Sequence, residues 1–158
     1  MATLEHFSVL SSDAIRTNYR LGRFVDLIGY RVRPLSASGT IRVSPGDTII
    51  LWVYWRNIQP STTAYRAFIH LGENPIWAQQ DDDPACRLPT SVWRAGQLTR
   101  GQFRLVVPRG IPIGRYPLSL GLYDPVTMER LIVIDEHGQP IGDSVSLLTV
   151  EVSSLSGE

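Results

Sequence analysis

The run DTIILWVYWRN at residues 47–57 constrains the fold more than any other part of the sequence. Successive side chains of a strand point to opposite faces. Alternation therefore places Ile49, Leu51, Val53 and Trp55 on one face, and Ile50, Trp52 and Tyr54 on the other. Because β-branched and aromatic residues pack well on a pleated surface, the run predicts a strand that is covered on both faces.

Short apolar runs of the same kind recur along the chain, and each is closed by Pro, Gly, Asn or Asp. They lie at residues 24–32, 39–44, 63–72, 76–80, 102–108, 114–124, 130–135 and 144–152. No useful stretch shows the three-and-four spacing of an amphipathic helix. About nine strands predict an all-β fold, a two-sheet antiparallel β-sandwich of the jelly-roll or immunoglobulin-like kind. Residues 63–72 are expected to pair with 47–57, which they follow in the chain.

One domain accounts for a chain of this length, and we expect a β-sandwich over residues 20–153. Residues 1–19 match neither period and are expected to form an N-terminal arm, with a short helix or an added strand as alternatives. Residues 154–158 are the expected C-terminal tail.

Charge and composition exclude several partners. Fifteen basic residues, all arginine, balance fifteen acidic ones, so no overall field gathers phosphates, and nucleic acid is not an expected partner. No run of apolar residues is long enough to insert into a membrane, and the first residues lack the pattern of an export signal. A single cysteine, Cys86, excludes an internal disulfide and a thiolate zinc site.

A series of motifs between residues 24 and 135 resembles a known domain. In order they are GY (Gly29, Tyr30), PG within PGDTIILWVYWR, HL within AFIHLGEN, AQQDDDP, PTSVW (Pro89–Trp93) and PIGRYPLSLGLYD. The series resembles the C-terminal, carbohydrate-binding-like β-sandwich domain of bacterial membrane glycosyltransferases of the protein-mannosyltransferase type. The resemblance implies an extracytoplasmic accessory module to which no catalytic residues are assigned.

Residues 77–93 combine the side-chain types that bind sugars. Aromatic faces stack on the apolar side of a sugar ring, while carboxylates and amides pair with its hydroxyls. The candidate glycan-binding residues are Trp77, Gln79, Gln80, Asp81, Asp82 and Trp93. The alternative is a structural corner in which Trp93 closes one end of the sandwich and Thr90 and Ser91 make local turn bonds.

The three aspartates Asp81, Asp82 and Asp83 raise the question of calcium. EF-hand spacing fails, because the sixth position is Cys86 and the twelfth is Val92. A looser calcium site built from these three carboxylates stays open beside a solvated acidic loop, and no other cofactor is expected.

Catalysis is not expected. A glycosidase needs two carboxyl groups across a cleft, and Asp81 with Asp83 is the one near pair in this stretch. His70 lies on an expected strand, where it would share the outward face with Arg66 and Phe68 if Ile69 and Leu71 face the core. It is interpreted as a partly buried histidine with a carboxylate or carbonyl partner, with a ligand contact as the alternative.

These observations predict a non-catalytic accessory module that binds glycan and is associated with a cell-envelope glycosyltransferase. The alternative is a structural or protein-interaction sandwich without a small ligand, which would dock a cell-envelope protein or form a homodimer through a sheet edge.

Overall fold

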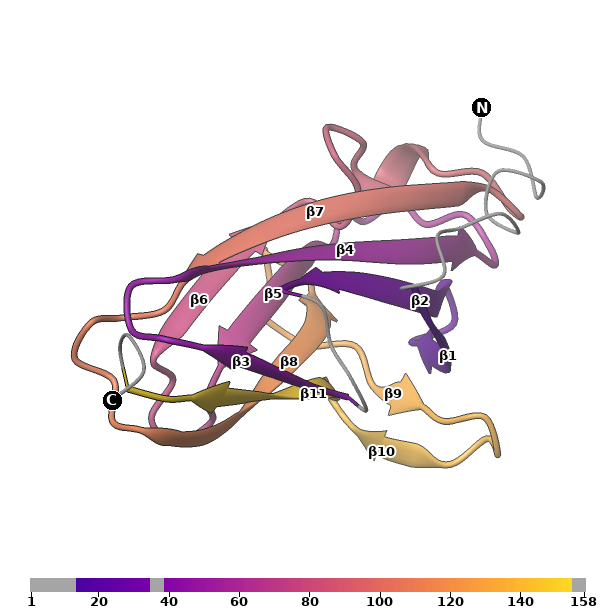
Figure 1. The fold of residues 1–158 in the computed structure, drawn as a ribbon. Coiled ribbons are helices and arrows are strands. Elements are labelled where there is room, and N and C mark those ends of the chain that lie inside the picture. The colour runs from indigo at the N-terminus through magenta and orange to yellow at the C-terminus, as the bar shows by residue number, and fades with distance from the viewer. Residues whose placement is uncertain (1–13, 35–38, 155–158) are drawn as a thin grey trace.

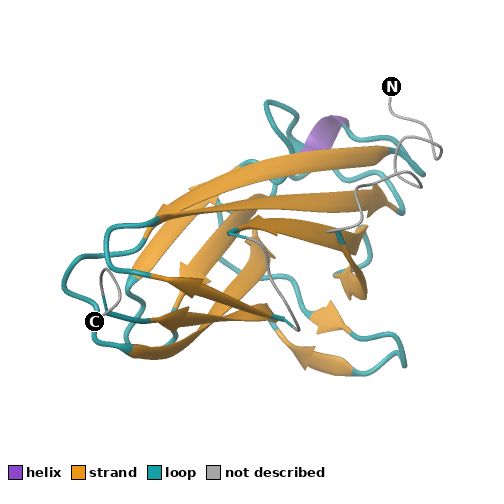
Figure 2. Ribbon diagram, in the orientation of Figure 1, coloured by secondary structure: helices purple, strands orange, loops and turns teal. Residues whose placement is uncertain are grey.

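A computed structural model describes residues 14–34 and 39–154. The chain folds into two packed β-sheets, as the alternating pattern predicts (Figure 1, Figure 2). The first sheet has the order β10-β9-β1-β2-β4-β7, and the second has the order β3-β11-β8-β5-β6. The described residues hold no helix with the length and hydropathy of a membrane span.

The strands of the first sheet are β1 (Ile15–Leu21), β2 (Val25–Arg33), β4 (Thr48–Asn57), β7 (Leu98–Val106), β9 (Val133–Ile134) and β10 (Pro140–Gly142). Those of the second are β3 (Thr40–Val43), β5 (Arg66–Leu71), β6 (Ala78–Asp82), β8 (Gly114–Tyr123) and β11 (Val145–Val152). A 3-10 turn, η1 (Thr90–Val92), lies in the connection from β6 to β7. The pairs are antiparallel except for β3, which runs parallel to β11.

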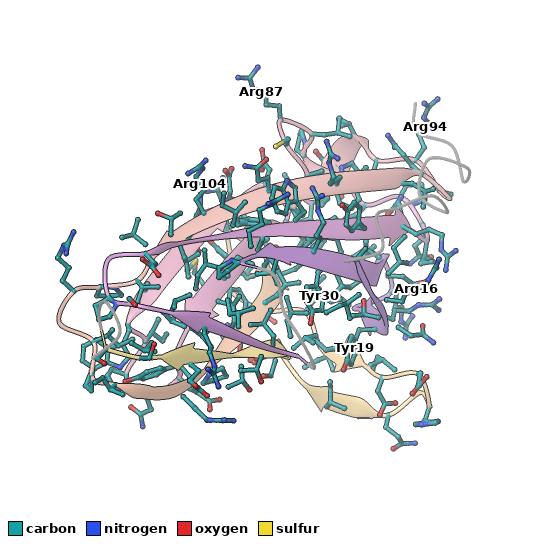
Figure 3. All side chains as sticks on the ribbon, in the orientation of Figure 1. Arg16, Tyr19, Tyr30, Arg87, Arg94 and Arg104 are labelled. Carbon is teal, nitrogen blue, oxygen red and sulfur yellow. The ribbon has the colours of Figure 1, made fainter. Side chains whose placement is uncertain are left out.

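The core lies between the two sheets. The odd-numbered residues of β4 face it as predicted: Val53 and Trp55 are fully buried, and Leu51 is 1% exposed. Tyr30 also points between the layers, where its hydroxyl donates a hydrogen bond of 3.1 Å to the Leu147 carbonyl of the opposite sheet (Figure 3). The outward residues of β4 are partly covered too, since Tyr54 is only 3% exposed.

One expected strand pairing needs correction, and part of the expected N-terminal arm lies in a strand. Residues 63–72 were expected to pair with 47–57, but β4 pairs with β2 and β7, whereas β5 pairs with β6 and β8 in the other sheet. The connection between β4 and β5 therefore crosses from one layer to the other. The last five residues of the expected arm, 15–19, lie in β1, which pairs with β2, and so correspond to the added-strand alternative, while residues 1–13 lie outside the described residues.

The acidic stretch after β6 is also a crossing between layers. It leaves the second sheet at Asp82 and enters the first at Leu98. The Pro84 carbonyl in this crossing accepts a 3.0 Å hydrogen bond from the indole N–H of the fully buried Trp55. The crossing is thus anchored to the centre of the core.

Candidate functional site

A pocket of about 330 Å³ opens on the outer face of the second sheet. The strands contribute Phe68 and His70 from β5, Gln79 and Asp81 from β6, and Tyr123 from β8. Ile76, Met128 and Arg130 come from neighbouring loops and complete the lining. The pocket therefore combines apolar side chains with a carboxylate, an amide, an imidazole and a guanidinium.

Strand alternation brings these side chains together. Ile69 and Leu71 are fully buried in the core, so Phe68 and His70 point to the opposite face. In the register of β5 with β6, Phe68 is opposite Asp81 and His70 is opposite Gln79. Neighbours across antiparallel strands are close enough for their side chains to interact.

Phe68 forms the floor of the pocket. Its ring lies over Gly121 of β8, where a β-carbon would come within 2.2 Å of the ring. The His70 ring is 4.6 Å from it, and the Arg130 guanidinium lies 4.2 Å from its centroid in a cation–π contact. Although it faces outward, Phe68 is only 2% exposed, because these side chains cover it.

Asp81 is held by hydrogen bonds from two sides. The Tyr123 hydroxyl donates to its Oδ2 at 2.8 Å, and Gln79 Nε2 donates to its Oδ1 at 3.2 Å. Burial first, and then the hydrogen bond to Asp81 and its charge, raise the pKa of Tyr123, so the phenol stays protonated at neutral pH. The carboxylate keeps a fixed orientation and has lone pairs left for a ligand.

His70 is kept neutral by its surroundings. Burial is the largest cause that lowers the pKa of His70, the positive charge of Arg130 lowers it further, and Asp81 acts in the opposite direction. The expected carboxylate or carbonyl partner is not seen among the described residues, where the contact of His70 is the Phe68 ring. A neutral imidazole can both donate and accept a hydrogen bond, which suits a hydroxyl ligand.

The lowered pKa of His70 predicts how stability depends on pH. The unfolded chain binds a proton at this residue more readily than the folded chain, so stability falls as pH drops through roughly 6.5, the ordinary value, and levels off below the folded value. Urea unfolding of the wild type and His70→Gln at several pH values should show a smaller loss on acidification in the variant. An equal loss in both proteins would contradict the assigned environment of His70.

The other residues of the predicted sugar site do not join this pocket. Gln80 points toward the first sheet, where its Oε1 accepts a 2.6 Å hydrogen bond from the Arg104 backbone N–H. Asp82 is exposed and accepts from the Asp83 backbone N–H at 2.7 Å. Trp77 packs against the edge of the core beside Gly72. Of the predicted set, the structure brings Gln79 and Asp81 together.

The PTSVW segment has the features of a structural corner. Trp93 is 2% exposed, and its indole N–H donates a 2.9 Å hydrogen bond to the Leu88 carbonyl. The bonds of Thr90 are not local: its hydroxyl donates to the Thr63 carbonyl and accepts from the Tyr65 backbone N–H, both at 2.8 Å. This corner therefore fastens the β6–β7 crossing to the segment before β5.

The three aspartates have separate partners. Asp81 binds Tyr123, Asp82 caps the next backbone N–H, and Asp83 lies 3.9 Å from Arg66. In the part of the chain that the structure describes, no group of three or more His, Cys, Asp or Glu side chains is placed to hold a metal ion.

The resemblance of this chain to known proteins lies in its fold rather than in its overall sequence. No family model matches this sequence, and no curated protein matches it. Among solved structures, the C-terminal domain of wzt superposes with a TM-score of 0.57 at 10% identity, over 89% of this chain and 80% of that one. A Niemann-Pick type C2 protein from Japanese carpenter ant has a TM-score of 0.47 at 10% identity, over 88% of this chain and 99% of that one. The first likeness shows a shared β-sandwich fold.

A second, larger hollow of about 460 Å³ lies beside β1 and the β9–β10 hairpin. Its lining includes Arg16, Tyr19, Asp135, Glu136 and His137. Asp135 Oδ1 is occupied by the backbone N–H groups of His137 and Gln139 in the hairpin turn, both at 2.9 Å. Because the Asp135 carboxylate serves the turn and Glu136 lies 3.8 Å from His137 Nε2, this hollow is a weaker candidate than the pocket on the second sheet.

Sequence reasoning missed Phe68, Tyr123 and Arg130 as site residues. Phe68 was placed on the outward face with His70, but without a ligand role. Tyr123 and Arg130 follow β5 by more than fifty positions. The long-range β5–β8 register brings Tyr123 to the pocket, and an isolated bridge to Tyr123 places Arg130 there. Tyr123 is the third residue of the GLYD motif, and Arg130 lies six residues after the motif ends at Asp124, which was the available signal.

Proposed function

We propose that this chain is a non-catalytic binding module that holds part of a glycan in the pocket on the outer face of the second sheet. The observation that carries the proposal is the convergence of Asp81, Gln79, His70 and Arg130 around one pocket with apolar walls. Sugar sites combine polar groups that pair with hydroxyls and an apolar surface for the C–H face of the ring. Ile76, which is 40% exposed, and Met128, which is 67% exposed, supply that apolar surface.

In the proposed complex, the polar side chains of the pocket act as hydrogen-bond acceptors and donors for different sugar atoms. The free lone pairs of Asp81 accept from sugar hydroxyls, and the Gln79 amide and Arg130 guanidinium donate to ring or hydroxyl oxygens. Arg130 is steadied by Asp143, whose Oδ1 lies 3.3 Å from Arg130 Nη1. A positioned donor loses little side-chain entropy when a ligand binds.

The same geometry supports binding rather than hydrolysis. Asp81 is the one carboxylate among the described lining residues, whereas hydrolysis of a glycosidic bond uses a pair of carboxyl groups flanking it. Asp81 is also committed to Tyr123 and Gln79. Its role in the proposal is therefore to hold a hydroxyl in place.

Asp81→Asn tests the pocket directly. Wild-type protein screened on a glycan array identifies a saccharide, whose affinity is then measured by titration calorimetry. Loss of a charged hydrogen-bond acceptor removes about 1.5–3 kcal/mol, so the Kd should rise at least about tenfold in Asp81→Asn.

Asp82→Asn is the matched control, because it makes the same charge change on the exposed neighbour. Its Kd should stay within about twofold of wild type, since surface charges contribute little. Equal loss in both variants, or no saccharide binding by the folded wild type, would count against the pocket.

We further propose that the module serves a cell-envelope glycosyltransferase on the extracytoplasmic side of a membrane. The support is the series of motifs from Gly29 and Tyr30 to the GLYD segment, which resembles that accessory domain. Protease treatment of intact cells stripped of their outer layers should digest the domain if it is extracytoplasmic. Full protection until the membrane is broken would contradict this placement.

A further inference from the structure

The outer faces of the two sheets differ in how their arginines are used. On the second sheet, ion pairs join Arg42 and Arg115 to Glu151, Arg66 to Asp83, and the adjacent Arg130 to Asp143. The overall charge of zero therefore conceals an uneven distribution. The outer face of the second sheet is therefore locally neutral, whereas the outer face of the first sheet differs.

Three neighbouring strands of the first sheet have segments that contain arginine but no acidic residue. The arginine face is the outward side of residues 31–33 of β2, 48–54 of β4 and 100–106 of β7, and no Asp or Glu occurs in these ranges. Strand register sets its side chains in rows: Arg33, Ile50 and Arg104 in one, and Arg31, Trp52 and Gln102 in the next. Arg100, opposite Tyr54, begins a third row.

The arginines of this face have no acidic partner among the residues that the structure describes. None of Arg31, Arg33, Arg100 and Arg104 takes part in an ion pair within residues 14–34 and 39–154. Arg33, Arg100 and Arg104 are exposed, and Arg104 projects away from β7 (Figure 3). The buried Arg31 Nε has no hydrogen-bond partner in the described chain.

The spacing suits an extended anion. Outward residues two apart on a strand are roughly 6.6 Å apart, and side chains on alternate strands of a row are separated by about 10 Å. A guanidinium pairs with a carboxylate through two parallel hydrogen bonds, and is less strongly hydrated than an ammonium. Such a grid fits a polymer that bears carboxylates at intervals.

The aromatic residues of the face argue against single-stranded nucleic acid. Proteins that bind such strands stack bases on open aromatic rings. Here the Arg31 guanidinium already lies 4.1 Å from the centroid of the Trp52 ring, and Tyr54 is 3% exposed. We propose that the arginine face binds the carboxylate groups of an acidic polysaccharide, on the sheet opposite the pocket and independently of it.

The test compares two triple variants with equal charge changes. Arg33→Gln, Arg100→Gln and Arg104→Gln together remove the exposed charges of the face. The control combines Arg42→Gln, Arg109→Gln and Arg115→Gln, which lie outside it. Binding to alginate, a carboxylated polysaccharide, is measured by biolayer interferometry at about 0.05 M and about 0.5 M salt, because exposed charges are screened over this range.

The wild type and the control variant should bind alginate at low salt and release it at high salt, and the first variant should bind at least about tenfold more weakly. No alginate binding, or equal loss in both variants, would overturn the proposal. So would binding of oligothymidylate or of phosphatidylglycerol vesicles in preference to alginate. Binding of a neutral saccharide to the pocket should be unchanged in the first variant, which separates failure of this proposal from failure of the proposed function.

Discussion

Gly101→Ala is expected to lower the free energy of unfolding by about 3 kcal/mol. Gly101 is on β7 beneath the β6–β7 crossing, and a β-carbon there would lie 1.9 Å from the Pro84 carbonyl oxygen. The clash is with backbone, so no rotamer change relieves it. The same oxygen accepts the Trp55 indole N–H, and moving it would leave a buried donor unpaired.

Urea unfolding followed by tryptophan fluorescence measures this loss. Gly110→Ala is the matched control: a β-carbon there meets nothing within 4 Å, and the change should alter stability by less than about 0.5 kcal/mol. If Gly101→Ala does not fold, Trp55→Phe, which removes the indole N–H together with part of the fully buried ring system, should lower stability by about 2–3 kcal/mol. Wild-type stability in Gly101→Ala would show that the crossing does not pack on β7 as described.

Gly121→Ala is expected to damage stability and binding together. Its β-carbon would lie 2.2 Å from Phe68 Cζ and 2.9 Å from the Asp143 carbonyl oxygen. The Phe68 ring would have to leave the floor of the pocket, which should reduce stability by about 2–3 kcal/mol. His70 and Arg130, which lie against that ring, would move with it, so the saccharide Kd should rise at least about tenfold.

A double-mutant cycle separates the ring clash from general damage. Phe68→Leu makes the side chain smaller, so in the Gly121→Ala background it should recover part of the lost stability. A coupling free energy of at least about 0.5 kcal/mol is expected between the two positions. Additive losses would mean that the Phe68 ring does not occupy the space over Gly121.

The sequence could predict which side chains of an individual strand face the core, because apolar and polar residues alternate along it. The core-facing residues of β4 could be identified from the alternation of side chains alone, because this pattern lies within one strand. β1 carried the same pattern, with Ile15, Tyr19 and Leu21 turned inward, but Thr17 and the flanking arginines weakened it. The pairing of strands was not predictable in this way: the expected contact between β4 and β5 depended on where a loop crosses between layers.

Alternation also explains which residues of the candidate pocket could be expected from the sequence. Gln79 and Asp81 alternate on one short strand, and the outward direction of His70 followed from buried Ile69 and Leu71. Tyr123 reaches the pocket through the β5–β8 pairing, which no local pattern encodes, and Arg130 is placed beside it by an isolated bridge to Tyr123. Trp93 was a candidate for stacking on a sugar ring because of its residue type. In the structure its N–H is bonded to the Leu88 carbonyl and its ring is buried.

The claim that the pocket on the second sheet binds glycan is tested most directly by two-dimensional amide NMR during titration with the saccharide that binds best on an array. The account predicts shift changes concentrated at His70, Gln79, Asp81, Tyr123 and Arg130, saturating with the calorimetric Kd. Changes centred on the Trp93 corner, or an unchanged spectrum with every saccharide, would contradict it.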